Sequence, residues 1–252
     1  MIKKSLGVLI LHGWTSAMST VSSLEAPIQA LGLPTRMPIL RGHGMSSPEA
    51  LKGVRWEDWV EDATSALDDL LSEVERVVIV GHSMGGMLAL HLAATHPEGV
   101  DSVVTAGSPG KMSTPFAPGN ILHPLFLILW PFIKKYDKGT LKYADPELEK
   151  LDDSYRWAPT SAIKELFDFL KVQKSILADV KVPALILQST KDTSVMPNSA
   201  NILFNEISTP VEDKKIVWFN KTEHGMFLDV ESKQVIQSVI DFIVERMKQE
   251  HE

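Results

Sequence analysis

Short apolar segments alternate with helical patterns along most of this chain, and that alternation limits the fold more than any other feature. The apolar segments are nearly continuous in Val, Ile and Leu, which is typical of parallel strands buried on both faces. Apolar residues over 54–73 instead recur at the three- and four-residue spacing of an amphipathic helix. The sequence therefore predicts an α/β fold with a mostly parallel central sheet flanked by helices. The expected strands are 7–11, 76–80, 100–106, 184–188 and 215–219, and the expected helices are 24–31, 54–73, 84–96 and 232–248.

One region interrupts this alternation. Residues 111–162 contain no convincing strand pattern and are rich in Leu, Phe and Trp. We expect a single domain over 1–252 with an insertion at 111–162, rather than a second domain. Prolines break up the insertion at positions Pro115, Pro118, Pro124, Pro131, Pro146 and Pro159.

Composition excludes several classes of function. The chain has 25 Lys and Arg against 32 Asp and Glu, a net charge of −7, whereas nucleic-acid binding depends on neutralising phosphates with basic residues. It has no cysteine, so disulfides, thiol nucleophiles and Cys-ligated zinc are excluded. No HExxH motif is present, and we expect neither a metal nor a cofactor.

Two apolar runs are candidates for membrane or export signals. Residues 6–11 follow two lysines but lead into His12-Gly13-Trp14 without a small-residue cleavage site, so a buried strand explains them better than a signal peptide. Residues 121–133 contain two prolines and are too short to span a membrane. These features predict a cytoplasmic protein without stable membrane insertion.

The segment Gly81-His82-Ser83-Met84-Gly85 carries the strongest chemical signal. It is a G-x-S-x-G motif between an expected strand and an expected helix, the context in which this motif forms a nucleophile elbow. Ser83 would sit on a tight turn where side chains two positions away would collide, which explains the two glycines. The N–H of Met84, at the start of the helix, is a candidate oxyanion donor. An ordinary glycine-rich turn between a strand and a helix is the alternative.

A serine nucleophile needs a base and an acid that orients the base. Among the histidines after Ser83, His224 alone follows an expected strand, and Asp192 lies just beyond the end of strand 184–188. The carboxyl ends of parallel strands form the sites of open α/β sheets. We therefore expect Ser83 as nucleophile, His224 as general base and acid, and Asp192 as the residue that orients His224. An exposed loop histidine and a turn-forming or capping aspartate are the alternatives.

A second oxyanion donor is expected in the loop after strand 7–11. The N–H of Trp14 is the candidate, because Gly13 lets the backbone approach a substrate oxygen; an ordinary glycine at the end of a strand is the alternative. His82 should point away from the site because side chains alternate along the end of a strand, so we expect it to have a structural role.

Together these residues resemble the α/β-hydrolase superfamily, and within it the small bacterial carboxylesterases and monoacylglycerol lipases. The resemblance implies a Ser-Asp-His triad, no cofactor and a small cap over the acyl pocket, which would correspond to residues 111–162. It also implies a structural role for the loop that contains His43. Residues 197–201 and 205–207 resemble the thermostable Bacillus-type carboxylesterases. The residues that carry the wider resemblance are His12-Gly13-Trp14, Arg41-Gly42-His43-Gly44, Gly81–Gly86, Asp192 and Glu223-His224-Gly225.

The predicted function is a serine carboxylic-ester hydrolase (EC 3.1.1) that forms an acyl-enzyme with small-molecule esters of short to medium acyl chains, monoacylglycerols among them. A monoacylglycerol lipase as the main activity, a thioesterase and a peptidase stay open, because the triad does not specify the leaving group. A non-catalytic ligand receptor on the same scaffold is the alternative from another class. A haloalkane dehalogenase would need Asp at position 83.

The apolar cap residues have two open interpretations, a lid that faces lipid and a cap that packs on its own core. These apolar cap residues are Ile121, Leu122, Leu125, Phe126, Leu127, Leu129, Trp130 and Phe132.

The sequence does not predict the oligomeric state.

Overall fold

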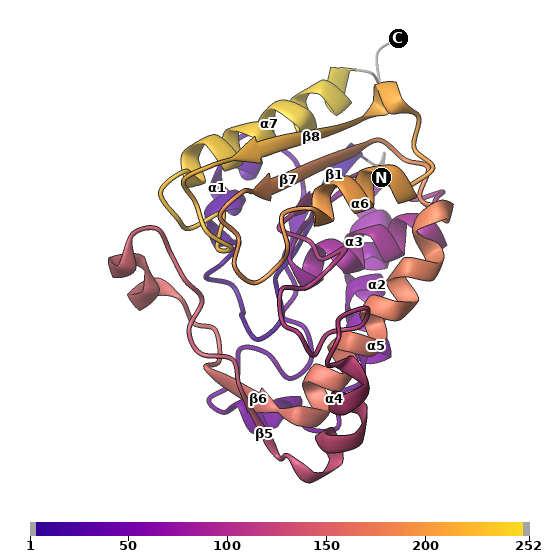
Figure 1. Cartoon of the computed structure of the whole chain (residues 1–252). Helices are drawn as coiled ribbons and strands as arrows, with labels where there is room; N and C mark the ends of the chain where they lie inside the picture. The colour runs from indigo at the N-terminus through magenta and orange to yellow at the C-terminus, as the bar shows by residue number, and fades with distance from the viewer. Residues whose placement is uncertain (1–3, 249–252) are drawn as a thin grey trace.

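The computed structural model describes residues 4–248, and its centre is a parallel sheet (Figure 1). Within these residues six strands form the sheet in the order β2-β1-β3-β4-β7-β8, and every neighbouring pair is parallel. The outer residues of the predicted 1–252 domain, 1–3 and 249–252, lie outside the described range. The strands are β1 (Lys4–Leu11), β2 (Thr35–Arg36), β3 (Val74–His82), β4 (Val100–Ala106), β7 (Ala184–Ser189) and β8 (Lys214–Phe219).

Helices cover both faces of this sheet, as the apolar character of the strands predicts. Alternate residues of one strand enter different cores: Val77 and Ile79 pack with α2 and α3, whereas Val78 and Val80 pack with α1 and α7. This period-two alternation explains why the strands are apolar at nearly every position. The helices are α1 (Glu25–Gln29), α2 (Trp56–Glu73), α3 (Met84–Thr95), α4 (His123–Leu129), α5 (Thr160–Ile176), α6 (Ser199–Glu206) and α7 (Ser232–Lys248).

The strand order creates a switch point between β1 and β3. The chain leaves β1 towards β2 on one side and returns to β3 on the other, and Leu11 pairs with Gly81 at the carboxyl ends. The loops after these two strands therefore diverge from the same edge of the sheet, where open α/β sheets bind ligands. These loops contain Gly13-Trp14 and Ser83.

The predicted insertion, residues 111–162, has more regular structure than its sequence indicates. It contains α4 and an antiparallel pair, β5 (Lys135–Asp137) with β6 (Trp157–Pro159), which lie together at the end of the molecule away from α7 (Figure 1). The expectation of no strand was wrong, because each strand has only three residues and its partner lies far along the chain. The short 3-10 helices are Ser22–Leu24, Pro48–Leu51, Trp130–Phe132, Pro146–Leu151, Leu177–Asp179 and Val211–Asp213.

Two further helices, α5 and α6, occur where the sequence analysis expects no element. For α5 a signal exists, since Ile163, Leu166, Phe167 and Leu170 are buried at helical spacing. Its neighbour α6 has only eight residues, too few for a clear periodic pattern. No helix in the described range is long and apolar enough to cross a membrane.

Gly85 provides a test of how tightly this framework is packed. A Cβ atom at Gly85 would lie 2.1 Å from the carbonyl oxygen of Leu11, a backbone atom that cannot move without shifting β1. We predict that Gly85→Ala lowers the free energy of unfolding by more than about 4 kcal/mol, measured by urea denaturation. Gly99→Ala is the control, because its Cβ would meet only the end of the Leu71 side chain, at 2.6 Å. Similar losses in the two variants would contradict this account.

Candidate active site

Ser83 occupies a strained turn between β3 and α3. Its φ of 52° and ψ of −115° lie in a region that non-glycine residues rarely adopt, at a cost of about 1–3 kcal/mol. The turn is held by the Ser83 N–H, which donates to the carbonyl of Ala106 at 2.8 Å. A Cβ at Gly81 would lie 2.2 Å from the backbone of Gly85, so both glycines of the motif are sterically required.

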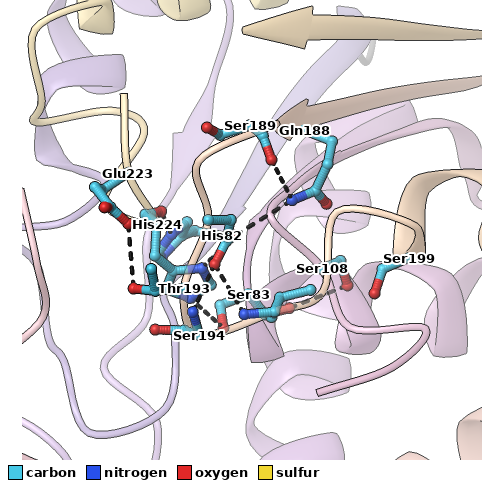
Figure 2. Close-up of polar contacts among 12 residues, drawn as sticks. His82, Ser83, Ser108, Gln188, Ser189, Thr193, Ser194, Ser199, Glu223 and His224 are labelled. Atoms are coloured by element: carbon cyan, nitrogen blue, oxygen red, sulfur yellow. Dashed lines mark hydrogen bonds and ion pairs between the residues drawn. The ribbon is translucent and has the colours of Figure 1, made fainter. Parts of the chain in front are cut away.

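The structure brings Ser83, His224 and Asp192 into one hydrogen-bonded chain. Figure 2 shows Ser83 and His224 side by side. His224 Nδ1 lies 2.7 Å from Asp192 Oδ2, and His224 Nε2 lies 3.0 Å from Ser83 Oγ. A carboxylate can only accept, so Nδ1 donates its proton to Asp192. Nε2 is then free to accept the proton of the Ser83 hydroxyl.

Asp192 is buried but remains ionised. Burial alone would raise its pKa, yet the interaction with His224 and the backbone N–H groups of Val195 and Ser194 hold the pKa below its ordinary value. These two N–H groups donate to Asp192 Oδ1 at 2.8 and 2.9 Å, and Gln188 Nε2 donates to Oδ2 at 3.3 Å. The carboxylate therefore has enough donors to stay negative beside the imidazole.

Two backbone N–H groups near Ser83 are available to a ligand. Met84 is the first residue of α3, where an N–H has no acceptor within the helix. Trp14 follows Gly13, whose added Cβ would lie 3.2 Å from Ser83 Cβ. Within the part of the chain that the structure describes, neither the Trp14 nor the Met84 N–H donates to another group. This arrangement is suited to an oxyanion.

The other histidines near the site are buried and neutral. His82 Nε2 donates to the carbonyl of His224 at 2.9 Å, and burial lowers the pKa of His82 to about 3. Burial also lowers the pKa of His43 to about 3; its ring contacts His12 and Trp59 edge to face. His12 donates from Nδ1 to Gly13 and accepts from the Leu40 N–H at Nε2. All three side chains support loops of the site.

A cavity of about 330 Å³ opens above Ser83 and His224. Residues of the predicted insertion form much of its wall, and Ile163 and Leu166 of α5 add apolar surface. A larger cavity of about 700 Å³, lined by α5 and α6 residues among others, contains none of the predicted site residues. The remaining lining residues of the smaller cavity are Trp14, Thr15, Met112, Ser113, Thr114, Tyr136, Lys138, Thr140, Leu141, Thr193, Ser194 and Val195.

Within residues 4–248 no group of three or more His, Asp or Glu side chains is placed to hold a metal ion.

Sequence reasoning missed Asp229, which joins the insertion to the loop of His224. Its buried carboxylate accepts from the Ala144 N–H at 3.0 Å and from the Glu223 N–H at 2.6 Å. Tyr143 packs against Gly225, where an added Cβ would lie 2.4 Å from the tyrosine ring. An acidic residue close after His224 was the only local signal, and the contact with Ala144 is not readable from the sequence.

The chain matches the model of the family described as serine aminopeptidase, S33, over residues 3–231. It belongs to this family of α/β hydrolases. The predicted fold class and the predicted superfamily are thereby confirmed.

Relatives and solved structures resemble this S33 family member over almost its whole length. The thermostable monoacylglycerol lipase of Bacillus sp. (strain H-257) is 27% identical, covering 94% of this chain and 90% of the relative. The carboxylesterase of Bacillus subtilis (strain 168) is 26% identical, covering 94% and 91%. A solved metagenome-derived lipolytic enzyme superposes with a TM-score of 0.84 at 24% identity, covering 97% and 95% of the two chains, and so shares the fold.

The buried histidines predict that acid destabilises the protein. In the unfolded chain His43 and His82 titrate near 6.5, whereas in the folded state their pKa values are about 3. At pH values between these two pKa values the unfolded state binds more protons than the folded state. The free energy of unfolding therefore falls as the pH falls, by about 1.4 kcal/mol per pH unit for each histidine. We predict that His43→Gln lowers the slope of unfolding free energy between pH 6 and pH 4 by about this amount, measured by urea denaturation. An unchanged slope would contradict the prediction.

Proposed function

We propose that this chain is a serine carboxylic-ester hydrolase that works through an acyl-enzyme. The observation that carries the proposal is the chain of hydrogen bonds from Ser83 through His224 to Asp192 at the base of a cavity. Relatives named carboxylesterase and monoacylglycerol lipase support an ester as the substrate.

In the proposed reaction Ser83 Oγ attacks the ester carbonyl while His224 Nε2 takes its proton. The N–H groups of Trp14 and Met84 bind the oxygen that becomes negative, and Asp192 stabilises the imidazolium. His224 returns the proton to the leaving alcohol, which leaves the acyl group on Ser83. Water then attacks the acyl carbonyl while His224 takes its proton. The bond to Ser83 Oγ breaks, His224 returns the proton to Ser83, and the carboxylic acid is released.

The cavity supports short to medium acyl chains as substrates. Its volume of about 330 Å³ lies at the low end of small-molecule sites, which run from about 300 to 1,000 Å³. We propose that residues 111–162 act as the cap of this pocket, because Met112, Tyr136 and Leu141 form part of its lining. A thioester as substrate stays an alternative, and a cytoplasmic location stays a prediction of the sequence.

We further propose that the cap contacts lipid surfaces. Phe126 packs inward against Phe167, so the cap does have a small core of its own. Ile121, Ile128 and Phe132, in contrast, are 88%, 66% and 82% exposed. Apolar side chains that gather at this exposure on one segment are typical of an interaction surface.

The nucleophile is tested by Ser83→Ala. We predict a loss of turnover of p-nitrophenyl esters of at least about 10³-fold, because the acyl-enzyme cannot form. Ser194→Ala, a serine that lines the same cavity, should stay within a few-fold of the wild type. Circular dichroism checks that both variants are folded, and activity near wild type in Ser83→Ala would refute the assignment. Labelling by a fluorophosphonate without multiple turnover would instead favour a ligand receptor.

The lipid contact is tested by the double variant Ile121→Ser with Phe132→Ser. Burial of two apolar side chains in a lipid surface contributes up to several kcal/mol to binding. We therefore predict that the double variant loses at least about tenfold in activity on micellar monoacylglycerol. Dissolved p-nitrophenyl butyrate should be hydrolysed at the wild-type rate. Val211→Ser, at a residue that is 70% exposed outside the cap, is the control. Equal losses on both substrates would argue against the lipid contact.

A further inference from the structure

The cavity above Ser83 has an unusual charge. Lys138 lines it, and among the lining residues within 4–248 there is no carboxylate; the other ionisable groups there are His224 and Tyr136. The chain as a whole has 32 acidic and 25 basic residues and a net charge of −7, so the sign of the charge in the cavity wall is opposite to that of the whole chain. A cavity that took only neutral esters would need no cation in its wall.

Lys138 is held in place by its backbone. It directly follows β5, and its N–H donates to the carbonyl of Arg156, next to β6, at 3.2 Å. The side chain is half-buried in the loop that also brings Thr140 and Leu141 to the cavity. The point at which the Lys138 side chain leaves the backbone is therefore tied to the β5–β6 pair.

The ammonium group of Lys138 has no hydrogen-bond acceptor or ion-pair partner among the described residues. The carboxylate whose charge acts on Lys138 is Asp152, and its Oδ1 accepts from the Ser154 N–H at 2.9 Å. Burial lowers the pKa of Lys138, and the charge of Asp152 offsets only part of this effect. An ammonium group that is partly desolvated and unpaired is unfavourable unless a ligand supplies the missing negative charge.

The rest of the wall is divided between polar and apolar surface. Among the lining residues Thr15 and Thr140 are polar, whereas Ile163, Leu166 and Val195 are apolar. A ligand that matches this lining has an apolar chain and one anionic end.

We propose that Lys138 recognises an anionic group, a carboxylate or a phosphate, on the ester that Ser83 attacks. This inference rests on the proposed function and narrows its substrate class to esters that carry a negative charge on the acyl half or on the alcohol half. Lys138 is a specificity-determining residue, because its ammonium contacts the charged end of the substrate rather than the reacting carbonyl.

Two pairs of esters separate the acyl half from the alcohol half. The p-nitrophenyl monoester of glutaric acid has its charge on the acyl half, and its methyl ester is the neutral partner. The butyrate ester of 4-hydroxybenzoic acid has its charge on the alcohol half, and its methyl ester is again the neutral partner. The quantity measured is kcat/KM for each ester with the wild type and each variant.

Lys138→Met should lower kcat/KM by about 10- to 100-fold for the charged member of at least one pair, the range of one hydrogen bond to a charged group. Both neutral esters should stay within a few-fold of wild type. Lys138→Arg should keep the preference, and Lys138→Glu should reverse it. Lys135→Met is the control, since Lys135 carries the same charge on β5 but lies over the ring of Trp157 outside this cavity.

The outcomes separate this inference from the proposed function. If Lys138→Met changes charged and neutral esters by the same factor, or if Lys135→Met has the same effect, the role of Lys138 is refuted while ester hydrolysis stands. If the wild type cleaves none of the four esters, the proposed function fails and the inference fails with it.

Discussion

The close contact between the start of α3 and the end of β1 is the constraint on which the rest of the site depends. Gly85 approaches the Leu11 carbonyl so closely that no side chain fits between them. This contact sets the angle at which the chain turns at Ser83, and it brings the loop of Trp14 beside the same turn. Within residues 4–248 the non-glycine residues with positive φ are Thr15 and Ser83, and both line the cavity. Backbone strain in this protein is thus concentrated where the chemistry is proposed to occur.

Burial determines which groups around this turn carry charge. His12, His43 and His82 all have lowered pKa values because the folded protein keeps water from them. Because these three histidines stay neutral, they add no positive charge beside His224, and the negative charge of Asp192 acts on His224. The same burial makes the loops that hold the site sensitive to acid. Stability and the electrostatics of the candidate site therefore have one physical origin.

The predicted insertion is anchored to the sheet domain at the loops that carry the site. Asp153 accepts from the N–H groups of Ala17 and Ser19, and the Tyr155 N–H donates to the carbonyl of Thr15. Asp229 joins Ala144 to the loop of His224. The helix α4, in contrast, has most of its apolar side chains exposed. One part of the insertion is thus suited to shape the pocket and another part to contact a surface outside it.

The sequence by itself determined the parallel sheet and the positions of Ser83, Asp192 and His224 after the ends of its strands, because these depend on local patterns. An apolar strand followed by a glycine-rich turn specifies its own conformation, and a parallel sheet places the carboxyl ends of its strands at one edge. Only the tertiary structure decided the β5–β6 pair, the bridge from Asp229 to Ala144 and the place of Lys138 in the cavity wall. These features join residues far apart in the chain within or next to an insertion without a periodic pattern. Their free energy comes from long-range contacts, which leave no local signature in the sequence.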